Sequence, residues 1–112
     1  MQHFIIANPH SGRGRGRDVL EIAERDFRER GLSFETAATG GPLDARRLAR
    51  AASERGFETI VVIGGDGSLH EAVNGLMESP RRPRLAQIPV GTGNSFIKDL
   101  GIESHEDGLR AI

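Results

Sequence analysis

Residues 60–76 read IVVIGGDGSLHEAVNGL, and this stretch decides the fold. A β-branched apolar run ends at Ile63, which predicts a buried strand. Three glycines then surround Asp66, although a plain turn needs only one or two. The amphipathic pattern that follows predicts a helix packed on a sheet, with its apolar face at Leu69, Ala72, Val73, Leu76 and Met77. The stretch is therefore a strand-to-helix corner with more glycine than a turn requires.

The same alternation of strand and helix runs along the chain. Apolar runs predict strands at residues 3–7, 33–38, 59–63 and 85–89. Helical spacing predicts helices at 17–30, 43–55, 69–77 and 95–100, the first two ended by Gly31 and Gly56. Apolar strands that alternate with helices predict an α/β fold, with a parallel sheet covered on both faces.

Small or glycine-rich corners follow all four predicted strands, at residues 8–16, 39–42, 64–68 and 91–94. The first of these, NPHSGRGRG, is predicted to be a loop. The carboxyl ends of parallel strands lie at one edge of the sheet, where ligands of such folds bind. Glycine permits positive φ and close approach to the backbone, and the N–H groups at a helix start favour phosphate. The corners therefore predict a phosphate site at this edge.

Asp66 is the residue that a phosphate site does not explain by itself, because a carboxylate repels phosphate. Three roles would explain Asp66 at this corner. It holds Mg²⁺ that bridges phosphate oxygens, it takes a proton from an attacking hydroxyl, or it is a turn residue. Ser68 and Glu71 form an S-x-x-E pattern, which predicts a capping box and does not exclude ligand contact. His70 is expected on the surface.

Composition and charge exclude several classes of protein. The chain has 112 residues, enough for one domain, with 15 basic and 16 acidic side chains and no cysteine. This balance predicts no nucleic-acid partner, and disulfides and thiolate metal sites are excluded. No apolar run approaches the roughly 20 residues of a membrane span, and no G-x-x-x-x-G-K-[ST] phosphate loop occurs. A cytoplasmic protein is expected.

Residues 64–76 resemble the signature of the diacylglycerol kinase catalytic domain family, which includes bacterial lipid kinases and the sphingosine and ceramide kinases. Three other stretches match in the same order. Residues 8–16 resemble its N-P-x-S-G loop, residues 39–52 its T-x-x-x-x-D-A segment, and residues 89–102 its P-x-G-T-x-N-D-F segment. The resemblance implies a parallel-sheet, three-layer nucleotide-binding domain of the diacylglycerol kinase/NAD kinase type over residues 1–112.

The resemblance also implies ATP and Mg²⁺ as cofactors, and transfer of the ATP γ-phosphoryl group to a lipid hydroxyl of diacylglycerol or sphingoid type. Asp66 is the implied catalytic residue, either organising Mg²⁺ through the nucleotide phosphates or acting in proton transfer. The implied nucleotide contacts are Asn8, Ser11, Thr39, Gly64, Gly65, Asp66, Gly67, Ser68, Leu69, His70, Glu71, Gly91, Thr92 and Asn94.

The chain departs from the family pattern in two ways. Ser95 stands where many members have Asp, and Ile97 and Lys98 replace the later A-R pair, which argues against a strict diacylglycerol kinase. Members are also much longer, with a second, β-rich domain, so we expect this chain to be the N-terminal domain and inactive alone.

Membrane contact and self-association follow as further expectations. The lipid substrate implies peripheral contact with a membrane surface in the full-length protein. An apolar face left where the second domain would dock implies a homodimer. A kinase of the NAD kinase type acting on a small molecule, and a non-catalytic nucleotide-binding module, are the alternatives.

Overall fold

The computed structural model describes residues 2–90, which alternate strand and helix as the sequence predicts. The strand β3 and the helix α3 are the strand and helix of the quoted stretch. The predicted helix at residues 95–100 lies outside the described residues. The elements are β1 (His3–Ala7), α1 (Ser11–Glu29), β2 (Phe34–Ala38), α2 (Asp44–Glu54), β3 (Thr59–Gly64), α3 (Asp66–Met77) and β4 (Arg84–Pro89).

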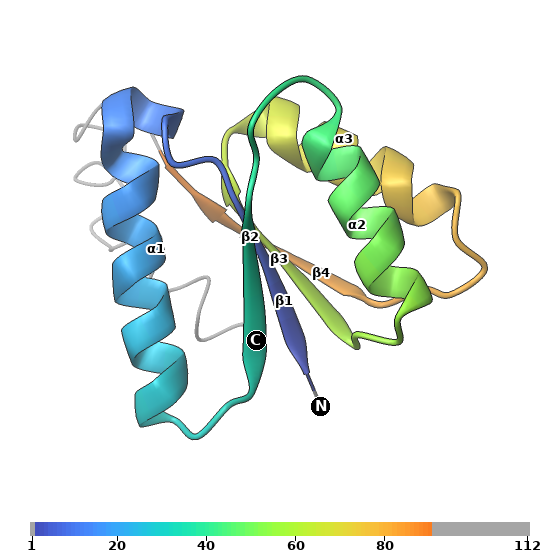
Figure 1. Cartoon of the computed structure of the whole chain (residues 1–112), viewed down its shortest axis with the longest axis horizontal. Helices are drawn as coiled ribbons and strands as arrows, with labels where there is room; N and C mark the ends of the chain where they lie inside the picture. The colour runs from blue at the N-terminus through green and yellow to red at the C-terminus, as the bar shows by residue number, and fades with distance from the viewer. Residues whose placement is uncertain (1, 91–112) are drawn as a thin grey trace.

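The four strands form one parallel sheet in the order β2-β1-β3-β4. In its register, Ile5 of β1 lies opposite Thr36 of β2 and Val61 of β3. Helix α1 covers one face of the sheet, and α2 and α3 lie side by side on the other (Figure 1). The predicted three-layer α/β architecture is confirmed.

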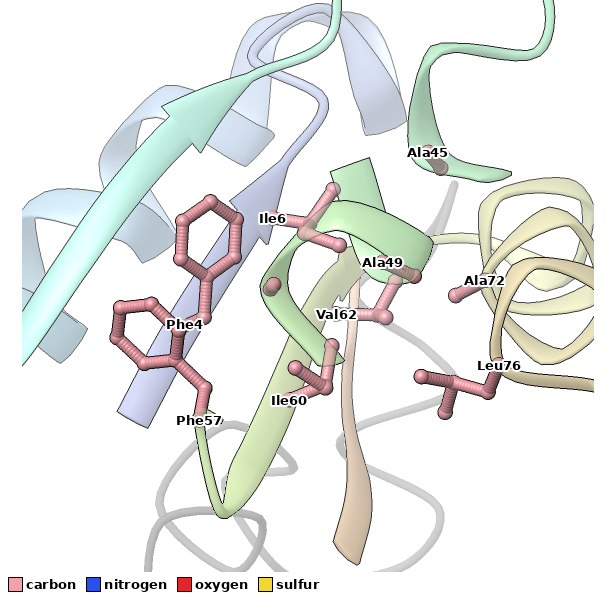
Figure 2. Packing of buried hydrophobic residues seen from close by; sticks show 10 residues of the cluster. Phe4, Ile6, Ala45, Ala49, Phe57, Ile60, Val62, Ala72 and Leu76 are labelled. Carbon is pink, nitrogen blue, oxygen red and sulfur yellow. The ribbon is translucent and has the colours of Figure 1, made fainter. Parts of the chain in front are cut away.

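Two apolar clusters hold the helices to the sheet. The cluster under α2 and α3 contains Phe4 and Phe57, whose rings meet edge to face at 5.1 Å (Figure 2). Figure 2 also shows side chains of α3 directed toward the sheet. The cluster under α1 centres on Phe27 and on sheet residues of the opposite face. Full burial of each large apolar side chain stabilises the fold by about 1.5–3 kcal/mol, so the two clusters fix both layers.

The predicted helix ends are confirmed at two glycines with left-handed backbone. Gly31 has φ +72° and Gly56 has φ +95°. Beyond the end of α1, Leu32 N donates to Phe27 O at 2.9 Å, which closes a Schellman motif. The return of the chain toward β2 and β3 is therefore set by glycines visible in the sequence.

The prediction of a loop over residues 8–16 is wrong in its extent. Helix α1 begins at Ser11, whose N–H donates to Asn8 O at 3.1 Å. The irregular part is confined to residues 12–14, where φ is +61°, +62° and +91°. A short left-handed turn therefore interrupts the helix near its start, and the glycines at positions 12 and 14 permit it.

Candidate functional site

The ends of three strands meet at one edge of the sheet, and backbone hydrogen bonds join them there. Asn8 N donates to Ile63 O at 3.0 Å, which links the residue after β1 to β3. Thr39 N donates to Ala7 O at 2.8 Å, which links the residue after β2 to β1. The predicted convergence is confirmed for three corners, and the helices that follow them start on this side (Figure 1). The fourth corner lies outside the described residues.

Asn8 organises the corner after β1 through its own polar atoms. Its Oδ1 accepts from His10 N at 3.1 Å, and its backbone oxygen accepts from Ser11 N. Gly16 packs directly against this turn, because a Cβ on Gly16 would lie 2.0 Å from Asn8 O. The turn and the start of α1 are thus fitted to each other, which brings Asn8 and Ser11 together at the edge.

The corner after β3 differs from the prediction in its helix cap. The N-cap residue is Gly65, with no side-chain cap, and α3 begins at Asp66. Ser68 is therefore the third residue of the helix, and the predicted capping box of Ser68 and Glu71 is wrong. A cap residue needs non-helical backbone, whereas Ser68 already lies within the first turn of α3.

Contrary to the prediction, the glycines of this corner do not have positive φ. Among the described glycines, positive φ occurs at residues 12, 14, 31 and 56 and not at this corner. A Cβ on Gly64 would lie 3.2 Å from Ser68 Cβ, so Gly64 gives space to the first turn of α3. A Cβ on Gly65 or on Gly67 would meet no atom of residues 2–90 within 4 Å. Glycine at these two positions leaves the helix start open to a ligand.

Asp66 is exposed at the first position of α3, beside the open glycines. His70 is exposed as predicted, and Leu69 and Glu71 are half-buried. Among residues 2–90, no group of three or more His, Cys, Asp or Glu side chains lies together as a metal site. A single carboxylate beside open N–H groups matches Mg²⁺ sites in which substrate phosphates supply the other ligands.

The remaining predicted contacts divide in two. Thr39 is half-buried in the turn after β2, at the same edge as Asn8 and Asp66. Gly91, Thr92 and Asn94 lie outside the described residues, so their predicted roles stay predictions. A hollow of about 830 Å³ in the described surface is lined by residues such as His3, Thr59 and Arg84 at the opposite, amino edge.

Sequence reasoning assigned no role to two residues that support this edge. Asp44 Oδ2 accepts from Gly40 N at 2.6 Å, and this bond is the main reason that the pKa of Asp44 lies below its ordinary value of 3.8. Gln87 Nε2 donates to Gly64 O at 3.3 Å. The signal for Asp44 was its place in the T-x-x-x-x-D-A segment, and the signal for Gln87 was a lone polar residue in an apolar strand.

The model of the diacylglycerol kinase catalytic domain matches residues 2–112. The chain belongs to this family. It is 43% identical to diacylglycerol kinase of Bacillus subtilis over 107 residues, which are 96% of this chain and 35% of that protein. It is 31% identical to sphingosine kinase B of Dictyostelium discoideum over an alignment of 113 positions, which covers 96% of this chain and 15% of that protein.

A crystal structure of a diacylglycerol kinase from Bacillus anthracis has the same fold, with a TM-score of 0.77 and 27% identity. The match covers 99% of this chain and 40% of that one. The chain thus spans about a third of the Bacillus subtilis family member that it matches. No helix among residues 2–90 is both long enough and apolar enough to span a membrane.

Proposed function

We propose that this chain is the ATP-binding half of a lipid kinase. The reaction is transfer of the ATP γ-phosphoryl group to the hydroxyl of a diacylglycerol or a sphingoid lipid. Membership of the diacylglycerol kinase catalytic domain family and the names of its relatives support a lipid kinase. The edge formed by Asn8, Thr39 and the start of α3 is the proposed place of the nucleotide.

The observation that carries the proposal is the open backbone at Gly65 and Gly67. Neither glycine has positive φ, and in the described part of the chain neither has a neighbour that would exclude a Cβ. Glycine inside a helix costs about 1 kcal/mol relative to alanine, so the fold by itself gains nothing from Gly67. A ligand that lies against the backbone explains both glycines, and the start of a helix favours an anionic one such as a phosphate chain.

Asp66 carries the chemistry of the proposed site. Its exposed side chain belongs to the first residue of α3, next to the glycines proposed to lie against the phosphates. Asp66 would hold Mg²⁺ together with phosphate oxygens, and the ion when bound neutralises the charge of the phosphates. The alternative role of Asp66 is to take the proton of the lipid hydroxyl, and nucleotide titration distinguishes the two roles.

Nucleotide titration tests the first half of the proposal. We expect the wild-type protein to bind Mg·ATP in calorimetry and the Asp66→Asn variant to bind at least tenfold more weakly if the carboxylate organises Mg²⁺. Unchanged binding with lost phosphorylation would instead assign Asp66 to proton transfer. Glu54→Gln, an exposed carboxylate at the far end of α2, is the matched control and leaves both properties unchanged. Absence of ATP binding to the wild type would refute the proposal.

An acceptor panel tests the second half. The full-length protein is presented with labelled ATP and with vesicles that contain diacylglycerol, ceramide or sphingosine, and NAD is offered as a soluble acceptor. Label in one of the lipids supports a lipid kinase and identifies its substrate. Label in NAD alone would support the NAD kinase alternative, and ATP binding with no acceptor would support a non-catalytic module.

A further inference from the structure

The turn between β2 and α2 holds a carboxylate whose role is unassigned. Asp44 is the first residue of α2, and its Oδ2 accepts from the backbone N–H of Gly40 at 2.6 Å. The N–H of Asp44 in turn donates to Gly41 O at 3.3 Å. The turn is therefore bound to the rigid start of a helix from two sides.

These contacts fix both peptide groups that flank Thr39. The peptide before Thr39 is held because Thr39 N donates to Ala7 O at 2.8 Å. The peptide after it is held because its N–H belongs to Gly40 and donates to Asp44. A peptide group is planar, so each bond orients the whole group. With both planes oriented, φ and ψ of Thr39 are set, and with them the direction of its Cβ at the edge.

The charge of Asp44 makes this bond a strong one. Hydrogen bonds to an ionised acceptor are shorter and stronger than neutral ones, and the Gly40 N to Asp44 Oδ2 distance is 2.6 Å. The pKa of Asp44 is held below its ordinary value, chiefly by the Gly40 N–H, so the carboxylate is ionised near neutral pH. Arg47 lies 3.5 Å away and balances the charge.

The backbone beside Asp44 shows that the turn is held in an unusual shape. Leu43 has φ +67°, in the left-handed region that a leucine rarely adopts, and its side chain is 58% exposed. Apolar burial therefore does not explain this conformation. Such a residue persists when its surroundings fix it, and the bond from Gly40 to Asp44 closes the turn around it.

We infer that Asp44 is a positioning residue that orients Thr39 toward the nucleotide. This inference rests on the proposed function, because Thr39 is one of the predicted ATP contacts. Asp44 acts through the backbone of the turn and does not itself contact the nucleotide. Its loss would lower affinity for ATP by releasing Thr39.

A double-mutant cycle with calorimetric Mg·ATP titration of the full-length protein tests the inference. We expect Asp44→Ala to weaken binding about tenfold and Asp44→Asn, which keeps a neutral acceptor, to weaken it about twofold to threefold. In a Thr39→Val background, Asp44→Ala should weaken binding by less than twofold further. Glu54→Ala, which removes a carboxylate from the same helix, should leave affinity unchanged.

The outcomes separate a positioning role from a merely structural one. If Asp44→Ala lowers the urea midpoint but leaves ATP affinity unchanged, or if its effect persists in full with Thr39→Val, the inference is wrong. If Asp44→Ala does not fold, the cycle of Asp44→Asn with Thr39→Val reads the same coupling. If the wild-type protein binds no ATP, the proposed function is wrong and this inference with it. If the wild type binds ATP and substitution of Asp44 leaves the affinity unchanged, the inference alone is wrong.

Discussion

Replacing Gly67 by alanine should stabilise the protein and weaken its binding of ATP. Gly67 is the second residue of α3, its φ is not positive, and a Cβ there would meet no atom of the described residues within 4 Å. The fold therefore accepts alanine without a clash, and alanine favours the helix by about 0.5–1 kcal/mol. If phosphate lies against this backbone as proposed, the added methyl group takes up part of its space. We expect a gain of about 0.5–1 kcal/mol in the free energy of unfolding and at least a tenfold loss of ATP affinity.

Gly75 of the same helix provides the matched control. A Cβ on Gly75 would lie 2.1 Å from Arg46 O, and backbone atoms cannot yield as a flexible side chain would. Helix α3 would have to move away from α2, and such overpacking costs about 1–3 kcal/mol. Gly75→Ala should thus destabilise the protein although the substitution is chemically identical. The residue also lies toward the end of α3 that is remote from the proposed site.

Urea unfolding followed by circular dichroism and calorimetric Mg·ATP titration measure the two effects on both variants. A variant stability change of 1 kcal/mol corresponds to about 4–8 °C in Tm for a domain of this size, which is well resolved. Two results for Gly67→Ala would contradict this prediction. The variant could be less stable than the wild type, or it could be more stable and bind ATP with unchanged affinity. In the second case the open glycine does not serve a ligand.

Three further predictions concern other parts of the described chain. Gly16→Ala should destabilise the protein by about 1–3 kcal/mol in urea unfolding, because its Cβ would lie 2.0 Å from Asn8 O. The pKa of Asp44 is lowered mainly by the Gly40 N–H, so its carboxylate stabilises the fold above about pH 4. This stabilisation is lost as pH falls through the folded-state pKa of Asp44. The stability of Asp44→Ala should therefore fall less steeply with acid than that of the wild type in unfolding titrations. Met77 is 65% exposed on α3, and Met77→Glu should weaken the homodimer that we expect, as measured by sedimentation velocity.

Each of these has an outcome that would contradict it. Wild-type stability in Gly16→Ala would mean that the turn at Asn8 adjusts without cost. Parallel acid profiles of wild type and Asp44→Ala would show that Asp44 gains nothing from its bond in the folded state. A monomeric wild-type protein at high concentration would remove the expected homodimer, and an undisturbed dimer in Met77→Glu would place its interface elsewhere.

The sequence by itself determined the order of the elements and the edge that carries the site. Apolar runs and helical spacing are local signals, and so are the glycines that end helices at Gly31 and Gly56. Once strands alternate with helices, a parallel sheet and the convergence of its corners follow from the limited ways to cover both faces. These parts required no knowledge of distant contacts.

The tertiary structure decided what depends on contacts between distant segments. The strand order β2-β1-β3-β4 arises from packing of the whole chain, and it brings Asn8 beside Ile63 and Thr39 beside Ala7. The sequence pattern placed the cap of α3 at Ser68, but pairing with β4 carries β3 through Gly64 and leaves Gly65 as the cap. The point where the chain turns from strand to helix depends on the close packing of Gly64 against Ser68, which a local capping pattern does not contain.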